Sequence, residues 1–204
     1  MSYPKKPSNW MESIPNQCAD ELADHGILVT SLIGCGDFGC VFNTSVPGRV
    51  IKFSFQESEA RSSIWLFNGG LKHAGLPKIY DAWMLDCYVH ESMWPISATL
   101  RDDIPDLKVA NLDWFELMTI EIEDSMLIHA HKPIANAEKL VTTDILDCLT
   151  NEPGGADELL IEELLDLGLF GLSHGFRIDD LLASNMGSKD GHLVIRDLGS
   201  VKLL

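Results

Sequence analysis

The chain has 204 residues, of which 46% are hydrophobic and 23% charged, so it is long enough for one core or for a small lobe joined to a larger one. Lysine and arginine number 15 against 31 acids, which gives a formal net charge of −16. This charge argues against direct nucleic-acid binding through phosphate contacts, and it permits a basic protein partner. No stretch approaches the ~20 apolar residues of a membrane span, so we expect no membrane contact.

Cysteine usage bears on the redox compartment. The cysteines are odd in number and scattered, without a CxxC pair, and the first ten residues lack the apolar run of a secretory signal. We therefore predict reduced thiols and a cytoplasmic protein, in place of a disulfide scaffold or a zinc site. The five cysteines are Cys18, Cys35, Cys40, Cys87 and Cys148.

Taken in chain order, the hydrophobic pattern predicts three regions. Residues 1–24 are an arm followed by a short helix that Gly26 stops. Residues 25–94 read as strands with one helix across them, and Pro95 begins a reduced, mainly helical region that extends to 204. The pattern therefore predicts an α+β fold.

Several individual elements follow from the same pattern. From Val50 to Phe55 the side chains alternate strictly, as in a strand with two different faces. Leu112–Ile122 is compatible with a helix or a strand, and that choice stays open. Beyond these, we predict helices over 56–67, 135–149 and 157–172, a hairpin of strands 78–85 and 87–94, and a second hairpin within 185–204.

A glycine-rich run is the first feature that carries chemistry. Gly34, Gly36, Gly39 and Val41 have a spacing that dinucleotide-binding turns share, so the glycines alone are a weak signal. Here a strand, a Pro-Gly turn and another strand follow, whereas a dinucleotide fold needs a helix at that point. This layout predicts a flap over nucleotide phosphates, with Asp37 and Phe38 at its tip; the alternative is an ordinary glycine-rich hairpin.

Lys52 lies on the strand after the flap, where an ammonium group can neutralise the α- and β-phosphates. Taken by itself, Lys52 reads more simply as a solvated strand lysine. Its carboxylate partner is open between Glu57 and Glu59, of which we prefer Glu59; the alternative is an acid that favours the first turn of a helix.

Two later segments supply acids and an amide. Asp180 and Asn185 stand five residues apart, a spacing typical of a loop in which the aspartate accepts a hydroxyl proton and the asparagine binds metal. Asp197 follows an apolar strand, 12 residues past Asn185, and begins an Asp-Leu-Gly triplet that suits Mg²⁺. The alternative for the first segment is a polar turn after a buried helix.

These motifs, in this order, resemble the protein kinase superfamily, and most closely the early serine/threonine kinases of short-tailed phages of the T-seven type. The resemblance covers about 31–95 and 157–200 and rests on these segments: Leu32-Ile33-Gly34-x-Gly36-x-Phe38, Pro47-Gly48-Arg49-Val50-Ile51-Lys52, Gly75-Leu76-Pro77-Lys78-Ile79-Tyr80-Asp81, and the spacing of Asp180 and Asn185.

The resemblance implies a minimal two-lobed kinase-like fold with a truncated C-lobe. It also implies ATP and Mg²⁺ as cofactors and transfer of the γ-phosphoryl group to serine or threonine hydroxyls. The substrates would be host proteins, such as transcription or defence factors, in the host bacterial cytoplasm. The sequence leaves the particular substrate and the oligomeric state open.

The sequence departs from the kinase pattern in three ways, of which the second and third, together with the negative charge, favour a different function. Ile178-Asp179 stands where kinases carry His-Arg, Leu182 replaces a common lysine, and only five residues follow Gly199, too few for an activation segment. Leu182 removes a cation from the developing charge, and Asp179 leaves the base assignment slightly open. The alternative is a weak or inactive kinase-like acidic protein that binds and inhibits a host factor.

Overall fold

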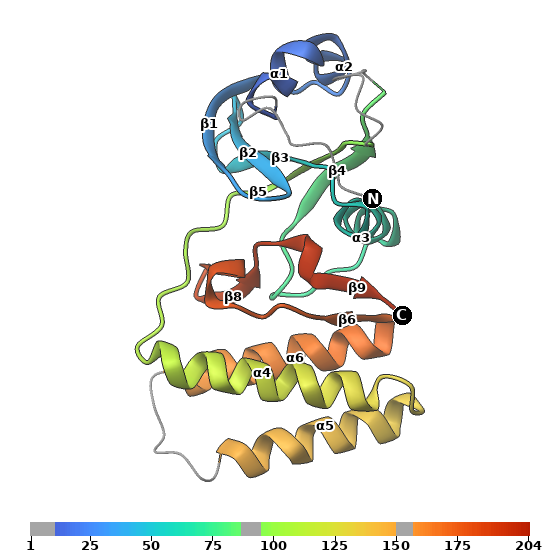
Figure 1. Ribbon diagram of the computed structural model, residues 1–204, viewed down its shortest axis with the longest axis vertical. Coiled ribbons are helices and arrows are strands. Elements are labelled where there is room, and N and C mark those ends of the chain that lie inside the picture. Colours follow the sequence, from blue (N-terminus) through green and yellow to red (C-terminus); the bar gives the residue numbers. More distant parts are fainter. Residues whose placement is uncertain (1–10, 87–94, 150–156) are drawn as a thin grey trace, which may run out of the picture. The chain divides into compact units, whose positions relative to one another are not determined.

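The computed structural model describes residues 11–86, 95–149 and 157–204, which form two compact units. Unit 1 comprises Met1–Gly70 and Lys78–Asp103, and unit 2 comprises Leu71–Pro77 and Ile104–Leu204. Unit 1 is built on an antiparallel sheet and unit 2 on a helical bundle (Figure 1). The predicted α+β class is confirmed.

Unit 1 contains a five-stranded antiparallel sheet with the strand order β1-β2-β3-β5-β4. The glycine-rich loop joins the first two strands, and helix α3 connects β3 to β4. This is the element order of a kinase-like fold. The strands are β1 (Val29–Cys35), β2 (Gly39–Thr44), β3 (Arg49–Ser54), β4 (Ile79–Met84) and β5 (Ser97–Asp102); the helices are the 3-10 turn η1 (Met11–Ser13), α1 (Ile14–Gln17), α2 (Ala19–Asp24) and α3 (Glu57–Gly69).

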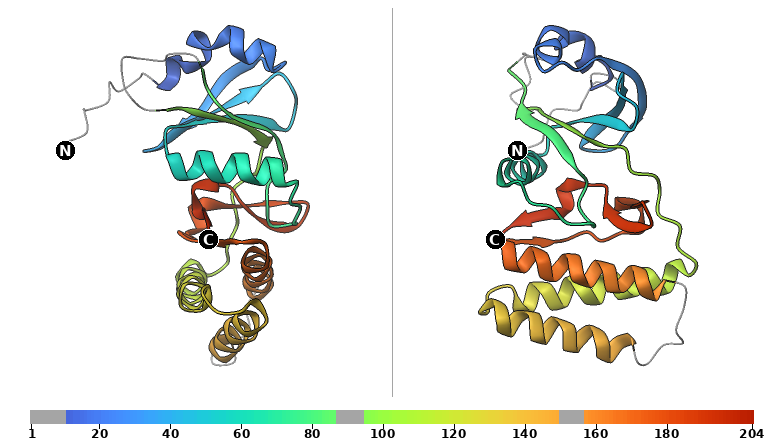
Figure 2. Two further views of the ribbon diagram at one scale, coloured as in Figure 1. Left: turned by 90° about the vertical axis from the view of Figure 1, so that its right-hand side faces the viewer. Right: turned by 180° about the vertical axis from the view of Figure 1, so that it is seen from behind.

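The two faces of the sheet have different neighbours. Ile51 and Phe53 point into a hydrophobic cluster that also contains Ile14 of α1 and Leu22 of α2. Lys52, between them in β3, points to the opposite face, where helix α3 packs against β3, β4 and β5. Figure 2 shows α1 and α2 on one side of the sheet and α3 on the other. The predicted alternation along β3 therefore separates a core face from a face that carries a charged residue.

The sheet extends past the boundary that we expected at residue 94. Strand β5 pairs with both β3 and β4, so residues 97–102 belong to unit 1. The predicted partner of the 78–85 strand, residues 87–94, lies outside the described residues. The partner that the structure shows for β4 is β5.

Unit 2 combines three long helices that pack against one another with two small antiparallel ribbons. Residues 112–122, which the sequence left between helix and strand, are helical. The helices are α4 (Leu112–His129), α5 (Ile134–Leu149) and α6 (Glu158–His174); the ribbons are β6 (Phe176–Ile178) with β9 (Val201–Leu203), and β7 (Met186–Lys189) with β8 (His192–Ile195); η2 (Ala183–Asn185) and η3 (Leu198–Ser200) are 3-10 turns. None of the helices that the structure describes is long and apolar enough to cross a bilayer.

The prediction of reduced cysteines is wrong for part of the chain. Cys35 and Cys40 form a disulfide, and Cys18 is disulfide-bonded as well. Cys35 and Cys40 face each other in the register of β1 and β2, with Cα atoms 4.1 Å apart, so the hairpin itself brings the thiols together. Because spacing along the sequence does not reveal cross-strand neighbours, the cysteine pattern gives no argument for a reducing compartment.

Candidate active site

The glycine-rich loop in unit 1 is a tight hairpin. The Gly36 amide donates to the Gly39 carbonyl at 2.9 Å, and the Cys35–Cys40 disulfide lies next to this hydrogen bond. At the tip, Phe38 is 52% exposed, with its ring centroid 6.0 Å from that of Phe55. The Phe38 carbonyl accepts the Phe55 amide at 3.1 Å, which ties the loop to the end of β3.

The glycines of this loop divide into two kinds. A Cβ on Gly39 would lie 2.4 Å from the Phe53 carbonyl oxygen, so close packing of β2 against β3 requires glycine there. A Cβ on Gly34 or Gly36 would meet no atom within 4 Å, and neither residue has a positive φ. The fold therefore does not require glycine at these two positions. A ligand that approaches the backbone closely would require it.

Lys52 and Glu59 form the ion pair that anchors the candidate site in unit 1. Lys52 Nζ lies 2.7 Å from Glu59 Oε1, with side chains only 12% and 3% exposed. Glu57, the other candidate, pairs with Arg61 on the exposed face of α3. Because β3 and the first turn of α3 place the lysine and Glu59 face to face, the pairing that the sequence left open falls to Glu59.

Burying this ion pair costs desolvation free energy, which a small unit can offset only in part. Removing two charges from water costs several kcal/mol per ion, and a buried pair repays that cost only when further hydrogen bonds satisfy the remaining polar atoms. Glu59 Oε2 is buried without a hydrogen-bond partner among the described residues. Stability alone therefore gives a poor account of the pair, and positioning of the lysine for an anion gives a better one.

In unit 2, the candidate catalytic loop follows β6 in an unusual backbone conformation. Asp180 has φ +56°, in the left-handed region that non-glycine residues rarely adopt. Asn185 Nδ2 donates to the Asp180 carbonyl at 2.9 Å and to its carboxylate oxygen Oδ2 at 3.0 Å. The predicted spacing thus brings the aspartate and the asparagine into direct contact, and the strained conformation is of the kind that concentrates at functional sites.

The neighbouring acid, Asp179, has a different environment. Its carboxylate accepts a hydrogen bond from Arg177 Nη2 at 3.0 Å and forms an ion pair with Arg177 Nε at 3.0 Å, and its amide donates to the Ser200 carbonyl at 2.7 Å. Asp179 is therefore held by the β6–β9 ribbon, whereas the Asp180 side chain is exposed. Of the two acids, Asp180 is the one whose side chain is exposed, and Asn185 orients it.

Asp197 lies beside Asn185 because β7 and β8 pair in the intervening hairpin. The Asn185 carbonyl accepts the Arg196 amide at 2.7 Å and the Asp197 amide at 3.2 Å. Asp197 Oδ1 accepts the Gly199 amide at 2.9 Å, which orients the carboxylate at the start of the turn η3. Unit 2 thus brings Asp180, Asn185 and Asp197 together on adjoining segments.

The chemistry of these donors fits Mg²⁺. Asn185 uses Nδ2 toward Asp180, which leaves its amide oxygen for a cation, and Asp197 contributes a carboxylate. Hard oxygen donors of this kind suit Mg²⁺, which keeps several waters and is bound by one or two protein groups together with substrate phosphates. Within the described parts of the chain, no group of three or more His, Cys, Asp or Glu residues could hold a metal ion alone.

Glu123 of α4 is a candidate site residue that the sequence analysis missed. Its carboxylate oxygen Oε1 accepts the Leu181 amide, the first backbone group after Asp180. Burial raises the pKa of Glu123, and the negative charges of Asp179 and Asp180 raise it further, against the lowering effect of the backbone amides of Leu181 and Asp180. No local signal reveals this contact, because Glu123 and Leu181 are 58 residues apart.

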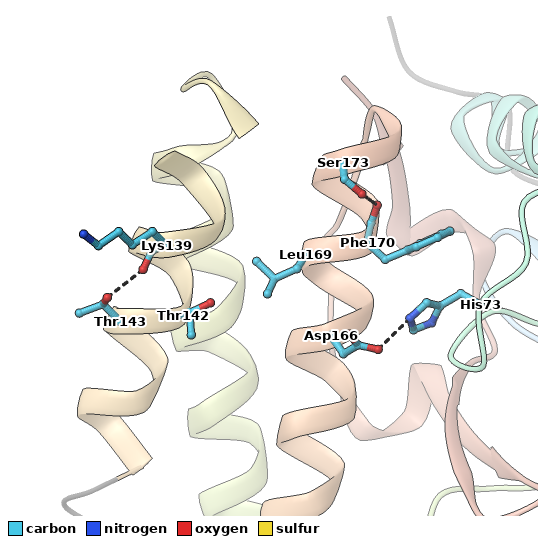
Figure 3. Close-up of a pocket in the computed structure, with 8 residues that line it drawn as sticks. All are labelled: His73, Lys139, Thr142, Thr143, Asp166, Leu169, Phe170 and Ser173. Carbon is cyan, nitrogen blue, oxygen red and sulfur yellow. Dashed lines mark hydrogen bonds and ion pairs between the residues drawn. The ribbon is translucent and has the colours of Figure 1, made fainter. Parts of the chain in front are cut away.

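An open groove of unit 2 contains none of the predicted site residues. It has a volume of about 770 Å³ and lies along α5 and α6 (Figure 3). Asp166 bonds to His73 at 3.0 Å, Ser173 Oγ donates to the Phe170 carbonyl at 2.8 Å, and Lys139 points away from α6. Most polar groups of this groove form hydrogen bonds within the unit. We therefore base the candidate active site on the motif residues and not on this groove.

The comparisons with known proteins add nothing to the description of the site. No protein family matches the sequence, and no curated protein matches it. Among solved structures, the chain is similar to a thermostable mutant of the aminoglycoside phosphotransferase APH(4)-Ia in its apo form, at 8% identity and a TM-score of 0.42. The match covers 89% of this chain and 70% of that one. At these values the likeness assigns neither activity nor substrate.

Proposed function

We propose that this protein is an ATP-dependent serine/threonine kinase that phosphorylates host proteins of a phage-infected bacterium. The observation that carries the proposal is the buried Lys52–Glu59 ion pair, 2.7 Å long, on the strand and helix that follow a glycine-rich hairpin. In kinases, a lysine held in this way contacts the α- and β-phosphates of ATP. Serine/threonine specificity and the phage setting rest on the sequence resemblance.

Unit 1 would bind the nucleotide phosphates. Because Gly34 and Gly36 carry no side chain, phosphate oxygens would have room beside the backbone there, and Asp37, Phe38, Gly39 and Val41 complete the hairpin. Lys52 would neutralise phosphate charge, while Glu59 fixes the direction of the lysine side chain. The glycine-rich hairpin would therefore leave the space of a phosphate free of side chains.

Unit 2 would supply the reacting hydroxyl with a proton acceptor. Asp180 is exposed, and Asn185 orients its carboxylate, so Asp180 would accept the proton of a substrate hydroxyl. Asn185 and Asp197 would hold Mg²⁺, which would neutralise negative charge on the phosphoryl group. Glu123, through the Leu181 amide, would keep the loop in the conformation that presents Asp180.

A second candidate is a kinase-shaped acidic protein that binds and inhibits a host factor. It is favoured by Leu182, which is 46% exposed where a serine/threonine kinase commonly has a lysine, and by the net charge of −16. The first candidate accounts better for Lys52, Asp180, Asn185 and Asp197, because a scaffold has no chemical need for all four. Inhibition of a partner that survives Lys52→Ala would favour the second candidate.

The test is a transfer assay with γ-labelled ATP and Mg²⁺, in the presence and absence of host lysate. We expect label on protein from the wild type and none from Asp180→Ala or Asp197→Ala. Asp180→Ala removes the hydrogen bond from Asn185 and Asp197→Ala the one from the Gly199 amide, so each variant should lose about 1 kcal/mol of stability and still fold, which thermal unfolding checks. Transfer that persists in both variants, or no transfer from folded wild-type protein with lysate, would contradict the proposal.

A further inference from the structure

The outward face of α4 combines apolar and acidic side chains in a single stripe. The inward face of the helix is buried through Phe115, Met118, Ile122 and Met126. At the ~100° per residue of an α-helix, the exposed residues on the other side fall within an arc of about 120°. These exposed residues are Asp113, Leu117, Ile120, Glu121, Asp124, Leu127 and Ile128; we call them the α4 stripe.

The apolar members of the α4 stripe are large and strongly exposed. Leu117, Ile120, Leu127 and Ile128 are 51%, 53%, 54% and 57% exposed. Exposed apolar residues scattered singly are ordinary in soluble proteins, but four large ones on one face of one helix are a feature that marks interaction sites. Figure 2 shows α4, α5 and α6 end-on, with α4 at one corner of the bundle, so the other two helices leave part of its surface uncovered.

The stripe has a definite spacing. Leu117 and Ile120 form one apolar patch, and Leu127 with Ile128 forms another, about 13 Å further along at 1.5 Å per residue. Between the two patches lie Glu121 and Asp124, both exposed. A complementary helix would therefore carry two apolar clusters at this separation with basic residues between them.

The negative charge of α4 and of the whole chain indicates what kind of partner could bind the α4 stripe. Helix α4 contains no lysine or arginine, and the whole chain carries a net charge of −16. Nucleic acid and anionic lipid would be repelled, and a second copy of the chain would set Glu121 and Asp124 against the same acids. We propose that the α4 stripe is a docking surface for a basic amphipathic helix of another protein. This inference does not depend on the proposed phosphoryl transfer.

The test uses a fluorescein-labelled synthetic peptide of ~18 residues, the length of α4, with leucines in two clusters and lysines between them. Fluorescence anisotropy measures its binding to the full chain. Two further peptides, one with the same composition scrambled and one with glutamate in place of lysine, serve as probes of helix pattern and charge. We expect saturable binding of the first peptide only.

Variants locate the binding on the protein. Leu117→Gln/Leu127→Gln and Glu121→Gln/Asp124→Asn should each weaken binding by about tenfold or more, since contacts at the centre of an interface carry most of its energy. Asp20→Asn/Asp24→Asn on α2 removes the same charge as the second variant from exposed positions and should leave the affinity within about twofold. All of these side chains are exposed, so the thermal unfolding should stay that of the wild type.

Three results would overturn the proposal. The first is equal weakening by the α4 and α2 charge variants, which would reduce the binding to general attraction by an acidic protein. The second is equal binding of the scrambled peptide. The third is a dimer in sedimentation that Leu117→Gln/Leu127→Gln dissociates, which would make a second copy the occupant. Asp180→Asn changes an exposed side chain and should bind the peptide as the wild type does even without phosphoryl transfer, so failure of phosphoryl transfer and failure of docking are separate outcomes.

Discussion

The two units hold their candidate site residues in opposite ways. In unit 1, Lys52 and Glu59 lie on a regular strand and a regular helix, and their contact is a side-chain ion pair with 12% and 3% exposure. In unit 2, Asp180 and Asn185 lie on irregular backbone, exposed or half-exposed, and the loop is held by hydrogen bonds to backbone groups. A substitution in the first site should therefore disturb the fold, whereas one in the second should mainly disturb the chemistry.

The strongest test of this contrast is a double-mutant cycle on the ion pair. Lys52→Met leaves a carboxylate buried and unpaired, which should cost about 3–5 kcal/mol of unfolding free energy. Lys52→Met/Glu59→Leu removes both charges and should recover most of that loss, measured by urea unfolding. The exposed pair Arg61–Glu57 on the same helix is the control, and Arg61→Ala should change stability by less than about 1 kcal/mol. If Lys52→Met were as stable as the wild type, the proposed difference between the two sites would be contradicted.

Glycine substitutions sharpen the contrast within unit 1. Gly39→Ala forces a methyl group to 2.4 Å from the Phe53 carbonyl oxygen and should cost about 1–3 kcal/mol of stability. Gly36→Ala meets open space, so its stability should stay within about 0.5 kcal/mol of the wild type. If Gly36 leaves room for phosphates, the same variant should raise the KM for ATP. If Gly36→Ala changed neither the stability nor the KM for ATP, phosphate binding at this hairpin would be contradicted.

Glu123 gives the corresponding test in unit 2. Because burial raises the pKa of Glu123 in the folded state, the protonated form is favoured there, and its contribution to stability is present below the ordinary glutamate pKa of about 4.3. That contribution is lost as the pH rises through the raised pKa. Glu123→Gln does not titrate and keeps an oxygen acceptor for the Leu181 amide.

The stability of the wild type relative to Glu123→Gln should therefore fall as the pH rises from about 4 toward neutrality, measured by urea unfolding at a series of pH values. A relative stability that stays constant or rises over this range would contradict the burial of Glu123.

The smallest expected effect concerns Asp144, which joins α5 to α4. Its oxygen Oδ2 accepts the Ser125 hydroxyl at 2.7 Å and contacts His129 Nε2 at 3.1 Å. The Ser125 hydrogen bond lowers the pKa of Asp144, as does His129, against a raising effect of burial. The wild type should therefore be more stable than Asp144→Asn above the ordinary aspartate pKa of about 3.9. This difference in stability should be lost as the pH falls through the lower pKa of the folded state.

Thermal unfolding between neutral and acid pH measures this difference, which should be small because the carboxylate is 47% exposed. Ser125→Ala removes the hydrogen bond and should reduce the pH dependence. A wild-type advantage that grows toward acid pH would show that Asp144 does not join the two helices in this way.

The parts of the fold that the sequence predicts are those with local signals. Ile51 and Phe53 alternate with Lys52, and this alternation identifies β3 and its two faces. Helix α3 ends at a glycine cap, with Gly70 at φ +60°, close to where the glycines predict the stop. The five-residue spacing of Asp180 and Asn185 likewise gives a contact that a single loop can make.

The missed features depend on contacts between distant segments. Strand β5 is fully buried yet contains Ser97, Thr99 and Arg101, so its composition resembles a polar loop. Glu123 and the Cys35–Cys40 pair are recognised only once the chain has folded. The α4 region was ambiguous because its apolar residues lie on both faces, which blurs the helical period and is the same property that creates the α4 stripe.

The central claim is that unit 1 binds the nucleotide and unit 2 supplies the proton acceptor. The most direct test is Asp180→Asn, which retains the size and polarity of the side chain and removes its basicity. We predict that kcat for transfer from γ-labelled ATP falls by about 10²- to 10⁴-fold, while binding of a fluorescent ATP analogue is unchanged. Phosphoryl transfer at the wild-type rate in Asp180→Asn would contradict the account.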